Sequence, residues 1–127
     1  MSYPTDYRYT KDHEWIQVEG NRARVGITKH AQEELGDIVF VELPSVGDGV
    51  QAGANVATVE SVKAVGDVVS PLNGTVAEVN DSLESAPETI NQSPHKDGWI
   101  VVIEISDNSQ LDGLMDAAGY EAFIAAG

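Results

Sequence analysis

The sequence contains no cysteine. Disulfides, thiolate metal sites and cysteine nucleophiles are therefore excluded, and any thiol chemistry would have to come from an attached cofactor. Basic residues are also scarce, with seven Lys and Arg against twenty-one Asp and Glu and a net charge of -14. Because protein–nucleic acid contacts depend on Lys and Arg, this balance argues against nucleic acid as a partner.

Long hydrophobic runs are missing as well. A membrane-spanning helix needs about eighteen or more consecutive apolar residues, and the chain has no such stretch. The first ten residues, MSYPTDYRYT, have neither the apolar centre of a signal peptide nor the composition of a transit peptide. We expect a protein of the bacterial cytoplasm, or of the mitochondrial matrix only if the chain is a processed eukaryotic one. The length suits a single domain over residues 1–127.

Enzyme signatures are absent too. The chain has no G-x-S-x-G, P-loop or dinucleotide-binding motif. Its three histidines, His13, His30 and His95, lack the paired spacing of a zinc site, so we predict no metal. His30 would share a helix face with Glu33 or Glu34, which is more often a surface pair than a metal site.

What the chain does contain is a series of short, valine-rich segments separated by turns. These predict a mainly β fold, a β-sandwich or flattened barrel with short helices at its margins. A first helix is expected over 29–35, capped by Thr28 and ended by Gly36. A C-terminal helix is expected over about 109–118, broken by Gly119, and residues 81–98 are expected to form a long polar excursion. Strands are expected over 15–18, 22–27, 37–43, 56–60, 65–70, 75–79 and 99–105.

Lys63 is one of only four lysines and lies between Val62 and Ala64, away from any neighbouring acid. Since the segments on both sides are strand-like, Lys63 should lie near the tip of a hairpin. The sequence Ser61 to Ala64 lacks the Asn-Gly or Asp-Gly pair that a tight hairpin turn prefers. The simplest alternative is an ordinary exposed lysine.

The residues around Lys63 favour a more specific interpretation. They include G-D-x-V-x-x-G at 47–53, and after it Val56, Glu60, Lys63-Ala64, Pro71, Gly74 and Val76. This frame resembles the biotinyl/lipoyl attachment domains, in which a lysine at a hairpin tip carries a cofactor through an amide. The attachment hairpin would lie within about 46–80. Biotinyl domains usually have methionine on both sides of the lysine, so Val62 and Ala64 favour lipoate.

Longer motifs extend the likeness over nearly the whole chain. They are D-H-E-W-I at 12–16, the run from Gly26 to Pro44, E-S-V-K-A at 60–64, D-G-W-I at 97–100 and A-A-G-Y-E-A-F at 117–123. Together they resemble the H-protein family of the glycine cleavage system. The resemblance implies a lipoyl-domain-like barrel-sandwich hybrid and a carrier component that is not itself an enzyme.

In that family, lipoate on the lysine, here Lys63, carries an aminomethyl group between partner enzymes. The donor is a pyridoxal-phosphate glycine decarboxylase (P protein) and the acceptor is a tetrahydrofolate-dependent aminomethyltransferase (T protein). Dihydrolipoyl dehydrogenase (L protein) then reoxidises the carrier. A lipoate ligase or octanoyltransferase would attach the cofactor, with Glu60, Ser61, Val62 and Ala64 as candidate recognition residues. A carrier that visits several enzymes would be most useful as a monomer.

The resemblance also implies a cleft that shelters the loaded arm, where acids would hold a cationic amine by charge-assisted hydrogen bonds. Asp67, four residues after Lys63 and about 13 Å along an extended strand, is one candidate. Glu14 is a second, although it could equally be a solvated strand residue, and Asp12 is a third. Two other roles stay open: a donor that relays lipoate or octanoate to other lipoyl domains, and an unmodified β-sandwich interaction module.

Overall fold

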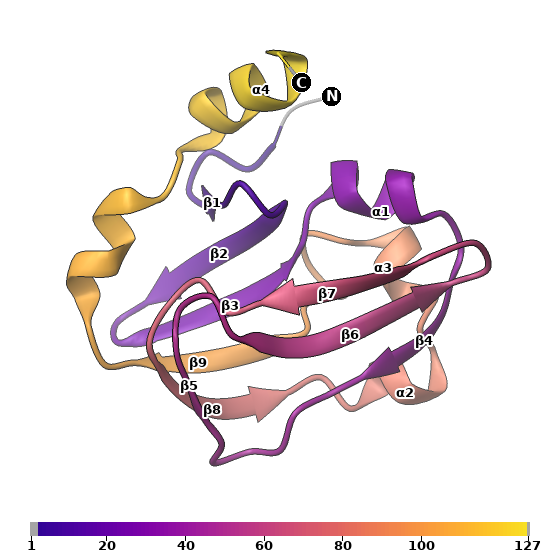
Figure 1. Ribbon diagram of the computed structural model, residues 1–127, viewed down its shortest axis with the longest axis horizontal. Helices are drawn as coiled ribbons and strands as arrows, with labels where there is room; N and C mark the ends of the chain where they lie inside the picture. The colour runs from indigo at the N-terminus through magenta and orange to yellow at the C-terminus, as the bar shows by residue number, and fades with distance from the viewer. Residues whose placement is uncertain (1–2, 127) are drawn as a thin grey trace.

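The computed structural model describes residues 3–126, which form nine strands in two antiparallel sheets (Figure 1). The six-stranded sheet has the order β1-β2-β3-β9-β8-β5, and the three-stranded sheet has the order β4-β6-β7. The two sheets pack on each other without closing into a barrel, so the predicted mainly β, sandwich-like fold is confirmed. The larger sheet contains β1 (Arg8–Tyr9), β2 (Glu14–Glu19), β3 (Arg22–Ile27), β5 (Gly49–Val50), β8 (Gly74–Val79) and β9 (Val101–Ile105); the smaller contains β4 (Ile38–Glu42), β6 (Asn55–Ser61) and β7 (Val65–Val69).

The main core lies between the sheets. Alternate residues of β3, Ala23, Val25 and Ile27, are buried, as expected for a strand with one face on the core. Val41 of β4 and Val59 of β6 meet them from the smaller sheet as members of the same cluster. Complete burial of each such Val or Ile side chain stabilises the fold by roughly 1.5–3 kcal/mol, which makes this packing the main force joining the sheets.

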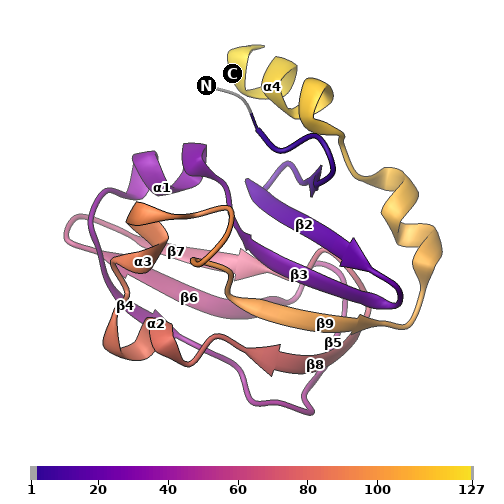
Figure 2. The same cartoon turned by 180° about the vertical axis from the view of Figure 1, so that it is seen from behind.

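A second, aromatic cluster joins the two ends of the chain. Tyr9 and Tyr120 stack with ring centroids 4.9 Å apart. Trp15 lies over Gly26 of the neighbouring strand, where any Cβ would come within 2.7 Å of the indole. The indole Nε1 donates to the carbonyl of Pro94 at 2.7 Å. This cluster holds the C-terminal helix against the N-terminal segment. The two segments lie side by side in both ribbon views (Figures 1 and 2).

The first predicted helix is confirmed as α1 (Lys29–Leu35). Thr28 Oγ1 accepts from Ala31 N at 3.3 Å, and Gly36 ends the helix with φ +85°. The predicted excursion over 81–98 carries two short helices, α2 (Ser82–Ser85) and α3 (Thr89–Gln92). Asn91 of α3 donates from Nδ2 to the carbonyl of Gly36 and accepts at Oδ1 from Ile38 N, both at 2.8 Å. The excursion thus fixes the connection between α1 and β4 (Figure 2).

The C-terminal helix differs from the prediction. Residues Asn108–Gly113 form a 3-10 helix, η1, and α4 spans Ala117–Ala126. Between them Met115 forms a β-bridge with Tyr9, which no helical segment over 109–118 could allow. Gly119 does not break α4, because its N–H donates to Asp116 Oδ1 at 2.7 Å in the first turn. The helix lies further along the chain because Tyr120 is buried in the aromatic cluster.

His95 should make the stability of the folded protein depend on pH. Its Nε2 accepts from Lys29 N at 3.1 Å, and burial, together with the Lys29 charge, lowers the pKa of His95. An unperturbed histidine has a pKa of about 6.5. At pH values between the lowered pKa of folded His95 and about 6.5, the His95 imidazole is therefore protonated in the unfolded chain but not in the folded protein. The free energy of unfolding should therefore fall as pH drops below about 6.5, by at most ~1.4 kcal/mol per pH unit from this group.

In His95→Gln, whose side-chain oxygen can still accept from Lys29, this part of the slope should disappear. Urea unfolding of both proteins between pH 7.5 and 5 measures it. Any slope left in the variant belongs to other groups, whereas equal slopes in the two proteins would contradict the assignment to His95.

Candidate functional site

The predicted hairpin around Lys63 is present, with β6 and β7 joined at its tip and Glu60 opposite Val65. Ser61 shapes the turn: its N–H donates to Ala64 O at 2.8 Å, and its Oγ accepts from Ala64 N at 3.0 Å and from Lys63 N at 3.3 Å. Among the described residues, His13 is the one non-glycine with positive φ, so the turn uses no left-handed residue. The Ser61 hydroxyl therefore explains how this tip forms without an Asn-Gly pair.

Lys63 is exposed, and its side chain crosses the end of α1. A Cβ placed at Gly36 would lie 3.3 Å from Lys63 Cε, so the glycine leaves room for this side chain as well as ending the helix. Val62 N donates to Asp37 O at 3.1 Å, which anchors the tip to the same connection. Within residues 3–126 the Lys63 ammonium forms no ion pair. The structure thus presents an accessible amine on a fixed turn.

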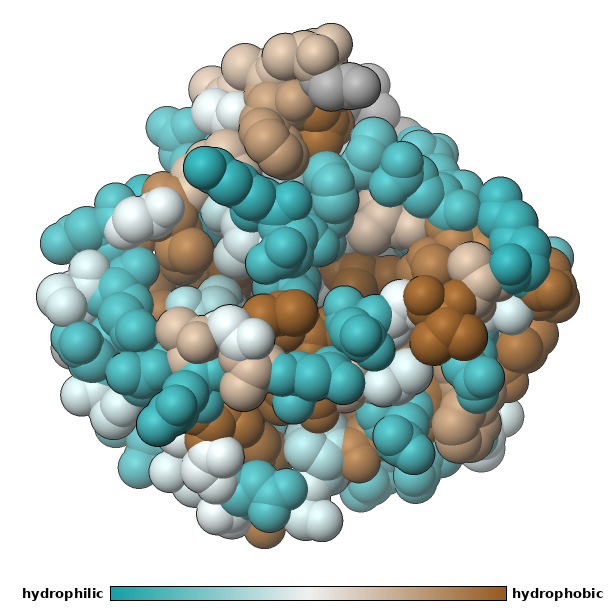
Figure 3. All heavy atoms as spheres, viewed as in Figure 1, coloured by the Kyte–Doolittle hydropathy of each residue, from teal (hydrophilic) through white to brown (hydrophobic). Residues whose placement is uncertain are grey.

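Exposed apolar side chains lie on the tip itself and on the neighbouring strand β4. Val62 is 70% exposed and Val65 63%, and nearby on β4 Val39 is 52% and Phe40 47% exposed. Phe40 lies opposite Glu60 in the β4–β6 pair. Hydrophobic residues gather toward the end of the molecule where the β6–β7 tip lies (Figure 3). Of the candidate recognition residues, Val62 and Ala64 are exposed, whereas Glu60 and Ser61 are half-buried.

Glu14 lies near the opposite end of β7 and is buried, with 1% exposure, so its alternative interpretation as a solvated strand residue is wrong. Its Oε2 accepts from Val69 N at 2.5 Å, and Thr10 Oγ1 donates to Oε1 at 3.3 Å. Because β7 is an edge strand, Val69 N has no strand partner on that side, and the carboxyl of β2 supplies one. Burial raises the pKa of Glu14 to about 8.

Glu14 lines a cleft of about 290 Å³ between the start of β2, the end of β7 and the segment after η1. Asp12 lines the same cleft, but Asp67 does not. Asp67 is exposed on β7, between the tip and the cleft, on the same strand face as Val69. The six residue steps from Lys63 in the turn to Val69 at the end of β7 span at most about 20 Å of extended chain. The structure therefore brings two of the three predicted acids together and places the third between them and Lys63.

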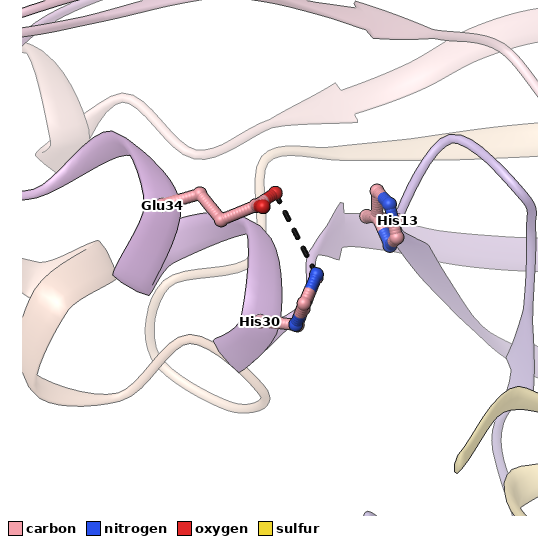
Figure 4. Close-up of side chains that lie close together, drawn as sticks. All are labelled: His13, His30 and Glu34. Atoms are coloured by element: carbon pink, nitrogen blue, oxygen red, sulfur yellow. Dashed lines mark ion pairs between the residues drawn. The ribbon is translucent and has the colours of Figure 1, made fainter. Parts of the chain in front are cut away.

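A further group of side chains was not predicted as a unit. His13, His30 and Glu34 offer ligand atoms that all lie within 4.8 Å of one another (Figure 4). The predicted surface pair on α1 is confirmed, with His30 Nε2 3.6 Å from Glu34 Oε1. The four-residue spacing of His30 and Glu34 predicts their pair from the sequence. Only the tertiary fold places His13 beside that pair.

None of the helices in the part of the chain that the structure describes is long and apolar enough to cross a membrane.

Two facing antiparallel sheets and an exposed lysine at a hairpin tip define a lipoyl-type β domain. Residues 7–126 match the family model described as "Glycine cleavage H-protein". The chain belongs to the glycine cleavage H-protein family.

Individual relatives agree with this assignment. The chain is 52% identical over 124 residues to the glycine cleavage system H protein of Brevibacillus brevis, covering 98% of each chain. It is 53% identical over 121 residues to that of Bacillus subtilis, covering 95% of each. The crystal structure of a glycine cleavage system H protein from Mycobacterium marinum superposes with a TM-score of 0.89 at 39% identity, over 97% of this chain and 99% of that one.

Proposed function

We propose that this protein is the lipoyl-bearing carrier of a glycine cleavage system, with lipoate attached by an amide to Nζ of Lys63. The observation that carries the proposal is the exposed Lys63 amine on the Ser61-shaped tip of a chain in this family. When bound, lipoate supplies a disulfide that accepts the aminomethyl group left after glycine is decarboxylated. The chain contributes attachment, shelter and recognition and does not catalyse a step.

Since the relatives compared are bacterial, we place it in the bacterial cytoplasm.

The residues around Lys63 fit an attached arm. The turn residues Val62 and Ala64 are exposed on both sides of the lysine, so an attaching enzyme can reach Nζ without moving a strand. The apolar side chains of Val62, Val65 and Phe40 offer that enzyme a contact surface beside the amine. Because Gly36 has no side chain, it leaves space for the Lys63 side chain from which the lipoyl arm would extend.

Glu14 fits the role of holding the carried amine. A protonated amine entering the cleft would favour the ionised carboxylate, and this opposes the burial that raises the pKa of Glu14. The Val69 and Thr10 hydrogen bonds fix the direction of the carboxyl group, so the ion pair would form without reorganisation. Asp12 adds negative charge at the cleft wall, and Asp67 adds it along β7.

Reconstitution tests this function directly. The lipoylated chain is mixed with P, T and L proteins, glycine, tetrahydrofolate and NAD, and NADH formation is followed by absorbance. Glycine, tetrahydrofolate and NAD should yield carbon dioxide, ammonia, methylenetetrahydrofolate and NADH only when the lipoylated chain is present. The same chain without lipoate is the matched control. Equal NADH formation with the unlipoylated chain, or none with a fully lipoylated one, would contradict the proposal.

A further inference from the structure

His13, His30 and Glu34 come together from two parts of the chain (Figure 4). His30 and Glu34 are one turn apart on α1 and face the same side. His13 lies in the turn just before β2, and its ring centroid is 4.7 Å from that of His30. This arrangement supplies two imidazoles and one carboxylate, a donor set that suits a borderline divalent cation.

His13 is held in place by the residues behind it. It has a φ of +66°, a conformation that non-glycine residues adopt at an energetic cost, so its surroundings must hold it there. Its Nδ1 lies 2.8 Å from Tyr120 Oη, which in turn lies 2.7 Å from Thr28 Oγ1. Thr28 N also donates to the carbonyl of His13 at 3.0 Å. The residue is therefore fixed by both its backbone and its ring.

This hydrogen-bond chain also selects a tautomer suited to metal binding. When His13 Nδ1–H donates to Tyr120, the Tyr120 hydroxyl can donate to Thr28 Oγ1, and the lone pair of His13 Nε2 is left available. Orientation of one ring nitrogen by a buried partner is the usual support behind a histidine that ligates a metal.

We propose that His13, His30 and Glu34 form a Zn²⁺ site that joins the turn before β2 to helix α1. Three protein ligands leave a fourth position for water, as in open zinc sites. Zinc–ligand bonds of about 2.1 Å require donor atoms about 3.4 Å apart in a tetrahedron, so the group, now within 4.8 Å, must contract. His30 and Glu34 lie at the helix surface with side chains 31% and 65% exposed, which leaves them free to rotate inward.

Calorimetric titration of the untagged, full-length chain with ZnCl₂ tests the site. We expect one equivalent to bind, and we expect the unfolding temperature to rise with Zn²⁺ but not with the same concentration of Mg²⁺. Co²⁺ substituted for Zn²⁺ should give the visible absorption of a four-coordinate site.

Three variants remove one ligand each: His30→Gln, Glu34→Gln and His13→Asn, the last because asparagine tolerates positive φ. Each should weaken Zn²⁺ binding by at least about tenfold and remove the Co²⁺ spectrum. The matched control is Glu33→Gln, which removes a charge from the same helix but outside the group, where Glu33 pairs with Lys29 at 3.1 Å. Circular dichroism establishes that each variant is folded.

Absence of stoichiometric binding at 100 μM Zn²⁺ would overturn the proposal. So would Glu33→Gln weakening the binding as much as Glu34→Gln, because the metal would then be held by the acidic surface in general. Neither result depends on lipoylation or on glycine cleavage.

Discussion

Lys63→Arg is expected to abolish lipoylation of this protein completely. Arginine keeps the positive charge and the length of the side chain, but its guanidinium stays protonated and offers no amine for amide formation. Because Lys63 is exposed and forms no ion pair among the described residues, the substitution should leave the fold intact. Intact mass, measured after incubation with lipoate, ATP and a lipoate ligase, should show one lipoyl increment on the wild type and none on the variant.

The control for this experiment is Lys96→Arg, since Lys96 is also exposed but lies far from the hairpin in sequence. It should gain the full increment. A lipoyl increment on Lys63→Arg would move the attachment site to another lysine. No increment on the folded wild type, with a ligase active on a known lipoyl domain, would leave the interaction module as the better hypothesis. An increment with biotin in the matching experiment would indicate carboxyl transfer.

The second large effect is expected at Glu14. Glu14→Gln keeps the size of the side chain and an oxygen that can accept from Val69 N, but the amide cannot ionise to pair with the protonated amine when it enters the cleft. A hydrogen bond to a charged group is worth roughly 1.5–3 kcal/mol, which corresponds to a factor of about 10 to 150. Loss of the carried aminomethyl group to water should accelerate by that factor. Formaldehyde released from the loaded carrier, followed over time without the T protein, measures the rate.

Asp67→Asn is the matched control because Asp67 is an exposed acid outside the cleft. It should change the release rate by less than about twofold, since exposed charges interact weakly through water. A release rate that responds to Asp67→Asn but not to Glu14→Gln would show that the amine rests along β7 and not in the cleft.

The two sites differ in how far the sequence could predict them. Lys63 was predictable because a hairpin is local: the turn and both strands lie within fifteen residues, from Asn55 to Val69. Ser61 stays a candidate residue for ligase recognition, and the structure also gives it the role of forming the turn. That role was accessible from the sequence, since serine hydroxyls commonly close turns onto their own backbone.

Other features depended on contacts between distant residues. The sequence leaves Glu14 open between a cleft acid and a solvated strand residue, because its burial depends on Val69 of the β7 edge, 55 residues away. The C-terminal helix was misplaced because its bounds follow the Tyr9–Met115 bridge and the burial of Tyr120, which no local periodicity reports. Likewise, His13 meets His30 only because the turn before β2 packs against α1.

The sequence by itself determined seven of the nine strands, all but the two-residue β1 and β5, together with the first helix and the lysine that projects from the hairpin, because these depend on turn chemistry and on side-chain patterns within a few residues. The tertiary structure alone decided which acids share a cleft and which histidines share a ligand set. Those neighbours are brought together by the packing of two sheets and by the aromatic cluster that joins the chain ends, and contacts between residues so far apart leave no periodic trace in the sequence.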